Sequence, residues 1–430
     1  MKKRLKDKLI LFISLVLIST IACEQLDEDY NKSSFKNPIR IGVIANVSIG
    51  REIAENIFFA VKMAADEINQ KGGIDIDGEK RKFELIFKDS EGNPKTGIKI
   101  VNELIERKVD IIIGPTTSAV AVEMTQLCID NNILMMTYSA TIPEISILED
   151  EDLIWRTCPS DAFSGRIMAQ YSIDSLQYMN GAILYRNDNF GVSMANIIQE
   201  RFESLGGSIV AKSYYPTNGV DISNYNYDDE INYLLEYEPQ IIFLAIFEEE
   251  VSKITQDLWY SNFYQDYNTK PTLFLTEGAF PKELLSNGQP EVLETIIGIS
   301  SSTTNTQNYS AYKSNYAEKY GFDPATYSEH AYDALYSIAY AIQKAQSVNP
   351  EDLKQKLRNV TKDTSPNHED IIINVNEFDK AIVLINSGVE INYNGASGKI
   401  DFDENGDPNS TFVIWGLEND KYKEISYYNR

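Results

Sequence analysis

The chain has 430 residues and a formal net charge of −25, from 39 Lys and Arg against 64 Asp and Glu. A surface this acidic repels phosphate backbones, which argues against nucleic acid as a partner. Only two His and three Cys are present, too few for a Cys/His zinc site or a disulfide scaffold. At roughly 100–200 residues per domain, the length predicts two or three domains with cores of their own.

The first residues carry the pattern of an export signal. A basic segment at 1–8 (MKKRLKDK) precedes an apolar run at 9–22 (LILFISLVLISTIA), which is shorter than the ~20 residues that span a bilayer. The small residues before Cys23 resemble a bacterial lipoprotein signal, in which this Cys is lipidated. Thr20 stands where that signal usually has Leu, so ordinary cleavage or an uncleaved anchor stays open. We expect a signal peptide at 1–22, a polar tether at 23–37 and a lipid-anchored, extracytoplasmic protein, with a merely secreted protein as the alternative.

From residue 39 onward, strand and helix patterns alternate along the chain. Expected strands cover 39–45, 83–87, 109–113, 133–137, 182–185, 208–213, 240–245 and 272–275. Expected helices cover 52–70, 94–107, 119–129, 162–176, 192–205, 227–237, 249–261 and 328–345. This alternation predicts an α/β fold with parallel sheets covered by helices on both faces, and the number of elements favours two doubly wound sheets over one.

Three loops after expected strands carry polar groups. Ligands bind beyond the carboxyl ends of strands in open parallel sheets, so these loops mark the candidate site. Residues 114–118 (GPTTS) and 138–141 (YSAT) offer hydroxyls, and the first loop enters a helix whose N-terminus favours an anion. Residues 276–279 (TEGA) offer the carboxylate of Glu277. Hydroxyls facing a lone carboxylate suit a zwitterion. The alternatives are that Ser118 and Thr141 only cap helices and that Glu277 is a solvated turn residue.

Eight segments carry a family resemblance. They occur in the order IRIGVIANVSIG, AADEINQKGGI, FKDSEGNPKTGIKIVNELI, VDIIIGPTTSAVA, ILMMTYSAT, WRTCPSD, LYRNDNFGVSMA and SGKIDFDENGDP. Together they resemble the bacterial extracytoplasmic binding proteins for leucine, isoleucine and valine, which serve ABC importers. The resemblance implies the type I periplasmic-binding fold, with two doubly wound, Rossmann-like lobes joined by a three-segment hinge. Lobe 1 would comprise 38–157 and 300–395, and lobe 2 would comprise 158–297 and 405–430.

The resemblance also implies the residues of a ligand site between the lobes. Ser118 would bind the carboxylate of an amino acid, and the loop at 138–141 would supply a backbone carbonyl at Ser139 and the hydroxyl of Thr141. Glu277 would take the ammonium from lobe 2, and the aromatic residues Phe190 and Tyr327 would line the pocket. Phe190 and Ile53 stand where the family has Tyr, which leaves the exact ligand open. The complete set of expected ligand-binding residues is Ile53, Thr117, Ser118, Ser139, Ala140, Thr141, Phe190, Glu277 and Tyr327.

The implied function is capture of a branched-chain-like amino acid by closing lobes and its delivery to the permease and ATPase subunits of an ABC importer. We expect a monomer without metal or cofactor, held at the membrane by its N-terminal lipid. The alternatives are a binding protein that feeds a sensor kinase or chemoreceptor, and a binder of amides, urea or other small amino-acid-like solutes. No G-x-S-x-G, H-E-x-x-H or G-x-x-x-x-G-K-[ST] motif occurs, which disfavours an enzyme.

Three smaller features have structural interpretations. Residues 401–407 (DFDENGD) resemble the start of an EF-hand loop, but Phe412 replaces its bidentate Glu, so we expect a β-turn. Cys128 and Cys158 are expected to be plain thiols, with a disulfide between them as the alternative. His330 is expected to be a packed core residue. The 26 Tyr residues have no explanation in the sequence.

Overall fold

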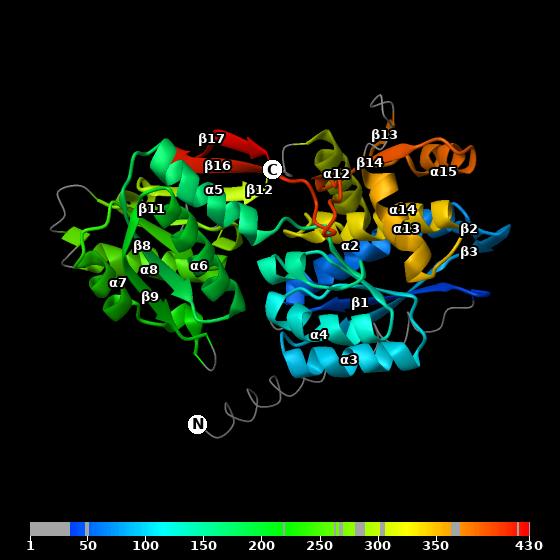
Figure 1. Ribbon diagram of the computed structural model, residues 1–430, viewed down its shortest axis with the longest axis horizontal. Helices are drawn as coiled ribbons and strands as arrows, with labels where there is room; N and C mark the ends of the chain where they lie inside the picture. Colours follow the sequence, from blue (N-terminus) through cyan, green and yellow to red (C-terminus); the bar gives the residue numbers. More distant parts are fainter. Residues whose placement is uncertain are drawn as a thin grey trace, which may run out of the picture.

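A computed structural model describes residues 35–47, 51–217, 220–261, 264–265, 270–279, 289–301, 306–362, 370–418 and 421–429. The expected signal peptide, Cys23 and the tether up to residue 34 lie outside these residues. The described chain forms two lobes that lie side by side (Figure 1). Across the described ranges, no helix has the length and apolar character needed to cross a membrane.

The sheet of lobe 1 is entirely parallel, with the order β4-β1-β5-β6-β7. Its strands are β1 (Ile39–Ala45), β4 (Phe83–Asp89), β5 (Ile111–Ile113), β6 (Leu134–Thr137) and β7 (Ile154–Arg156). Strand side chains alternate between two cores. Ile41 and Ile111 pack with helices α2 (Arg51–Gln70) and α13 (Ser328–Ala345), whereas Ile112 packs with α3 (Pro94–Glu106) and α4 (Ser118–Asp130). Burial on both faces explains why the central strand β5 is a continuous apolar run, whereas the edge strand β4 also carries charged residues.

Smaller elements complete lobe 1. They are β2 (Ile74–Ile76), β3 (Glu79–Arg81), α12 (Gln307–Tyr320), α14 (Pro350–Thr361), β13 (Ile371–Ile373), α15 (Phe378–Asn386), β14 (Ile391–Gly395) and β15 (Gly398–Lys399). This lobe also explains part of the tyrosine content, because six buried tyrosines on α12, α13 and β14 contact one another: Tyr312, Tyr316, Tyr332, Tyr336, Tyr340 and Tyr393. The hydroxyls of Tyr332 and Tyr336 both donate to Glu67, at 2.7 and 2.6 Å. Tyr therefore supplies apolar volume here while satisfying a buried carboxylate.

The sheet of lobe 2 has the order β17-β16-β12-β11-β10-β8-β9. Its parallel strands are β8 (Asn180–Arg186), β9 (Ser208–Tyr215), β10 (Ile241–Ala245), β11 (Thr272–Leu275) and β12 (Ile296–Ser301), and the antiparallel pair β16 (Thr411–Glu418) and β17 (Lys421–Asn429) adds one edge. Helices α5 (Asp161–Asp174) and α6 (Asn189–Ser204) cover one face, and α7 (Asp228–Leu235) and α8 (Glu248–Tyr260) cover the other. Short α11 (Pro290–Leu293) precedes β12.

The fold confirms the predicted pair of doubly wound sheets, and it adds strands that the sequence patterns did not predict. β12, β16 and β17 follow the last expected strand, and β17 carries alternating polar residues because it is an exposed antiparallel edge. The chain passes between the two sheets after β7, after β12 and before β16.

His330 secures the first of these passages. Its Nδ1 lies 2.7 Å from the carbonyl oxygen of Thr157, whose hydroxyl donates to the carbonyl of His330 at 2.8 Å. Burial lowers the pKa of His330 to about 4, against a weaker opposing effect of the Thr157 hydrogen bond. The prediction of a packed core histidine is confirmed.

Candidate functional site

Two loops at the carboxyl edge of the lobe 1 sheet are tied to each other. The hydroxyl of Thr137 donates to the carbonyl of Pro115 at 2.9 Å, and that of Ser139 donates to the carbonyl of Thr116 at 2.7 Å. Gly114 has a φ of 119°, and a Cβ there would lie 2.3 Å from the carbonyl oxygen of Ile44. Glycine is therefore required where the chain leaves β5. The two hydroxyl-bearing loops form one preassembled surface.

The N-terminus of α4 points to an anion site on this surface. Thr117 is the N-cap of the helix, but its side chain makes no capping hydrogen bond, and its hydroxyl oxygen is buried with no partner among the described residues. Ser118 is the first residue of the helix and is 8% exposed. The alternative of Ser118 as the N-cap is therefore wrong. An uncapped helix start beside two hydroxyls provides donors for a carboxylate.

Thr141 is joined twice to Asp161, a residue that the sequence analysis did not single out. The Thr141 hydroxyl donates to Asp161 Oδ2 at 2.6 Å, and the Asp161 N–H donates to the Thr141 carbonyl at 2.9 Å. Thr141 is not the cap of the following 3₁₀ helix, η2 (Pro143–Ile147), whose N-cap is Ile142. Because its proton is directed at Asp161, the Thr141 oxygen presents lone pairs to its other neighbours and suits a donor such as an ammonium.

Burial favours the protonated, uncharged form of the Asp161 carboxyl. Its pKa is raised to about 7, chiefly by desolvation, while the Thr141 hydrogen bond lowers it and the charge of Glu277 raises it further. The segment WRTCPSD ends on this residue, but an acidic residue in the first turn of a helix usually only complements the helix dipole. What places Asp161 in the candidate site is its hydrogen bond to Thr141, which is 20 residues away in the sequence.

Glu277 lies at the start of η4 (Glu277–Ala279), directly after β11. Its Oε1 accepts the backbone N–H of Ser301 at 2.8 Å, and burial raises its pKa in spite of that bond. The alternative of a freely solvated turn residue is thus wrong. In the described ranges no Lys or Arg forms an ion pair with Glu277, so its charge has no counter-ion within that part of the chain.

Tyr327 brings lobe 1 close to Glu277. It is the N-cap residue of α13 and has a φ of 69°, a left-handed conformation that is unusual for a bulky side chain. Burial raises the pKa of Tyr327 well above its ordinary value, and the charges of Glu277, Cys158 and Asp161 raise it further. These groups therefore lie within electrostatic range of one another at the junction of the lobes.

An aromatic pair lies after β8 and β10, at the carboxyl edge of the lobe 2 sheet. Phe190 stacks on Phe247 with ring centroids 4.8 Å apart, and the guanidinium of Arg186 lies 4.0 Å from the centroid of Phe247. Arg186 also pairs with Glu250 and Asp188. Phe247 was not predicted as a site residue, although it follows β10 at the same carboxyl edge as the loops that were. The positional rule applied to those loops would have identified it.

The remaining predicted residues have mixed positions. Ala140 is fully buried, and its N–H and carbonyl have partners in Thr137 and Arg156. The side chain of Ile53 lies outside the described residues.

Asp403 Oδ1 accepts the N–H groups of Asn405 and Asp407 at 2.8 and 2.9 Å, which confirms the expected turn. Cys128 and Cys158 are buried free thiols, so the alternative of a disulfide between them is wrong.

An uncapped helix start and acceptor groups thus lie at the carboxyl edges of the two sheets, and an aromatic pair lies at the carboxyl edge of the lobe 2 sheet. No cluster of His, Cys, Asp and Glu suited to a metal ion is found within the ranges that the structure describes. The arrangement offers donors and acceptors for the two charged ends of a small ligand.

Known proteins resemble this chain over most of its length. The model of the receptor family ligand binding region matches residues 58–420. Leu/Ile/Val-binding protein homolog 1 of Brucella suis is 24% identical over 316 residues, which cover 73% of this chain and 79% of that protein.

Two solved structures resemble the whole described chain. One is the branched-chain amino acid transporter substrate binding protein of Streptococcus pneumoniae in complex with isoleucine, with a TM-score of 0.69, 18% identity and coverage of 92% of this chain and 100% of that one. The other is an ABC transporter solute binding protein of R. palustris in complex with benzoate, with a TM-score of 0.70, 14% identity and coverage of 91% and 96%. Both likenesses establish the two-lobed binding-protein fold.

Proposed function

The chain belongs to the receptor family ligand binding region, and from this premise we propose that it captures a free amino acid between its lobes. The relatives include proteins named for leucine, isoleucine and valine binding, which supports a branched-chain-like ligand. The ligand would act as the bridge between the two lobes, and no bond would be made or broken.

The observation that carries this proposal is the polarity of the site. Asp161 and Glu277 are acceptors whose burial raises their pKa values, and the uncapped start of α4 beside Ser118 supplies donors. An α-amino acid matches both ends, because its ammonium meets the carboxylates and its carboxylate meets the helix start. The ammonium also relieves the desolvation of the two acids, which no neutral ligand would do.

The aromatic pair would contact the side chain of the ligand. Phe190 and Phe247 form a stacked, largely buried apolar pair and offer no hydroxyl, which suits an aliphatic or aromatic side chain. A plain aromatic acid such as benzoate would fill that surface but would leave both carboxylates without a cation. We therefore place a hydrophobic amino acid ahead of an aromatic acid.

Binding would be coupled to closure. The proposed lobes are 38–157 with 300–395 and 158–297 with 405–430, and Thr141 and Ser118 lie on the first while Glu277 and Phe190 lie on the second. Contacts that a ligand makes to both lobes exist only when they are together, so the ligand shifts the population toward the closed form. An importer or a sensor could then recognise that form, and we propose delivery to the permease and ATPase subunits of an ABC importer.

A thermal-shift screen tests the ligand class. The mature chain is heated with each of the twenty amino acids, with small amides and with benzoate. A ligand at 100 times its Kd adds about 2.7 kcal/mol of stability, and hydrophobic amino acids should give the largest shifts. Stabilisation by benzoate or an amide with none by any amino acid would contradict the proposal.

Anchoring and transport need separate experiments. We propose that Cys23 carries the lipid, so metabolic labelling with an alkyne fatty acid should mark the wild-type chain and not Cys23→Ala. Co-purification of the anchored, ligand-loaded chain with permease subunits would support import, whereas recovery with a sensor kinase would support the alternative.

A further inference from the structure

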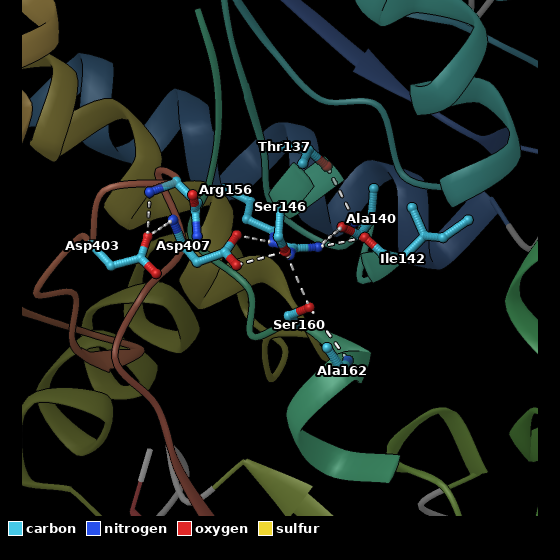
Figure 2. A network of polar contacts seen from close by, with 10 residues as sticks. Thr137, Ala140, Ile142, Ser146, Arg156, Ser160, Ala162, Asp403 and Asp407 are labelled. Atoms are coloured by element: carbon cyan, nitrogen blue, oxygen red, sulfur yellow. Dashed lines mark hydrogen bonds and ion pairs between the residues drawn. The ribbon is translucent and has the colours of Figure 1, made fainter. Parts of the chain in front are cut away.

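Arg156 lies at the centre of a buried polar network that includes the loop at 139–147, called the ligand loop below because Thr141 belongs to the proposed site (Figure 2). Its side chain is fully buried at the end of β7. Nη1 donates to the carbonyl of Ile142 at 2.8 Å and to that of Ala140 at 3.3 Å. These two carbonyls flank Thr141, so one guanidinium holds the backbone on both sides of a proposed ligand-binding residue.

Asp407 is the counter-ion of Arg156 and comes from the distant C-terminal part of the chain. Arg156 Nε donates to Asp407 Oδ1 at 2.6 Å. The turn that carries Asp407 is also attached through the backbone, because the Arg156 N–H donates to the carbonyl of Gly406 at 3.1 Å. This turn lies just before β16, on the last passage of the chain into lobe 2.

Ser146 extends the network to the first passage between the lobes. Its hydroxyl donates to Asp407 Oδ2 at 2.7 Å and accepts from Arg156 Nη2. The same hydroxyl lies 3.4 Å from that of Ser160, the N-cap of α5 in lobe 2 (Figure 2). The network therefore joins three segments: the ligand loop at 139–147, the passage at 157–160 and the turn at 403–407.

We infer that Arg156 and Asp407 are positioning residues for ligand binding, which set the geometry of the 139–147 loop and lock it to two of the passages between the lobes. This inference rests on the proposed function, because it assigns the loop to the ligand. Bending at the passages would then displace the carbonyls around Thr141, so loop geometry and closure change together.

The choice of residues fits this role. A guanidinium supplies donors in a planar fork and can reach two carbonyls, a hydroxyl and a carboxylate at once, which the ammonium of Lys cannot reproduce. A buried ion pair contributes little net stability, although loss of one partner leaves an uncompensated charge. The Arg156–Asp407 ion pair is therefore better explained by the loop geometry that it imposes than by a contribution to stability.

A matched pair of substitutions separates positioning from stability. Arg156→Lys keeps the charge and loses the fork. Arg358→Lys is the control, because Arg358 donates to the carbonyls of Asp403 and Glu404 in the same turn, at 2.8 Å each, and pairs with Asp152, yet none of its bonds reaches the 139–147 loop. We expect Arg156→Lys to raise the Kd of the amino acid found by the screen by about tenfold or more, and Arg358→Lys to change it by less than about threefold. Chemical unfolding of both variants reports their stability separately.

Hydrogen exchange of the ligand-free chain gives a readout that does not depend on the ligand. Arg156→Lys should accelerate exchange of backbone amides in 139–147 and 157–162, whereas Arg358→Lys should leave the 139–147 amides at the wild-type rate. If Arg156→Lys does not fold, Ser146→Ala takes its place, because it removes the hydroxyl that links both charged partners. We then expect faster exchange in the same two segments and a smaller rise in Kd.

The outcomes separate the two proposals. A wild-type chain that binds no amino acid refutes the proposed function, and the exchange data then decide whether the loop is locked to the passages. If the wild-type chain binds no amino acid and the 139–147 amides of Arg156→Lys exchange at the wild-type rate, the inference is overturned. Where the wild-type chain does bind, an unchanged Kd in Arg156→Lys, or equal losses of affinity in both variants, overturns it.

Discussion

Replacement of Asp161 by Asn should change how the stability of this chain depends on pH. Desolvation raises the pKa of Asp161 from 3.8 to about 7, while Thr141 and Arg156 act in the opposite direction and the charges of Glu277 and Glu144 act in the same one. The folded state therefore holds this proton up to a higher pH than the unfolded state does. Between roughly pH 4 and pH 7 the folded state binds more protons, so stability falls as pH rises and is level above that range.

The magnitude follows from the two pKa values. At 1.36 kcal/mol per pH unit, a rise from 3.8 to about 7 makes the ionised form cost about 4 kcal/mol of folding free energy. Asn carries no charge and lacks this cost. The free energy of unfolding of Asp161→Asn, relative to the wild type, should thus increase by about 3–4 kcal/mol from pH 4 to pH 8.

Urea unfolding followed by tryptophan fluorescence at several pH values measures this difference. Comparing the variant with the wild type removes the contributions of Asp333 and Glu67, whose pKa values are also raised by burial and whose charges do not act on Asp161. Asp174→Asn is the control, because Asp174 is exposed at the far end of the same helix. A difference for Asp161→Asn that is flat across this range would show that Asp161 ionises like an ordinary surface acid, and the assignment of a desolvated acceptor would fail.

Three further predictions concern other residues. Glu277→Gln should weaken binding of the amino acid ligand by about 2–5 kcal/mol, because it removes the charge facing the ammonium. Calorimetry checks this, with Glu236→Gln, an exposed residue at the end of α7, as the control; equal affinity in Glu277→Gln and the wild type would refute the role. Asp333→Asn should lower the free energy of unfolding by about 2–4 kcal/mol, since Asp333 accepts from the Tyr393 hydroxyl and from both the N–H and the hydroxyl of Ser397; wild-type stability in urea would contradict this. Gly114→Ala should lower the free energy of unfolding by more than about 1 kcal/mol, because its Cβ would lie 2.3 Å from the carbonyl oxygen of Ile44. A thermal unfolding midpoint equal to that of the wild type would contradict the close packing of this loop.

Much of the fold could be predicted because its signal is local. Buried parallel strands such as β5 and β10 are continuous apolar runs, and helices such as α3 begin at Pro and end where their apolar period ends. The polar edge strand β17 gave no such signal, because only its antiparallel pairing with β16 makes it a strand.

The candidate site was predicted only in part. The rule that ligands bind at carboxyl edges identified the loops that carry Ser118, Thr141 and Glu277, and it applied equally to Phe247, which was overlooked. Asp161 could not be found in this way, because its role depends on a hydrogen bond to a residue on another element.

The sequence by itself determined the fold class, the loops that carry polar groups and the acidic surface, because these depend on periodicity, spacing and composition. Only the tertiary structure decided which polar groups meet and in what state. It turned the Asp-rich segment at 401–407 into the counter-ion of a buried arginine rather than a cation loop. It also withdrew Asp161 from water next to Thr141. Both outcomes come from desolvation and from contacts between segments far apart in the chain, which local sequence patterns do not encode.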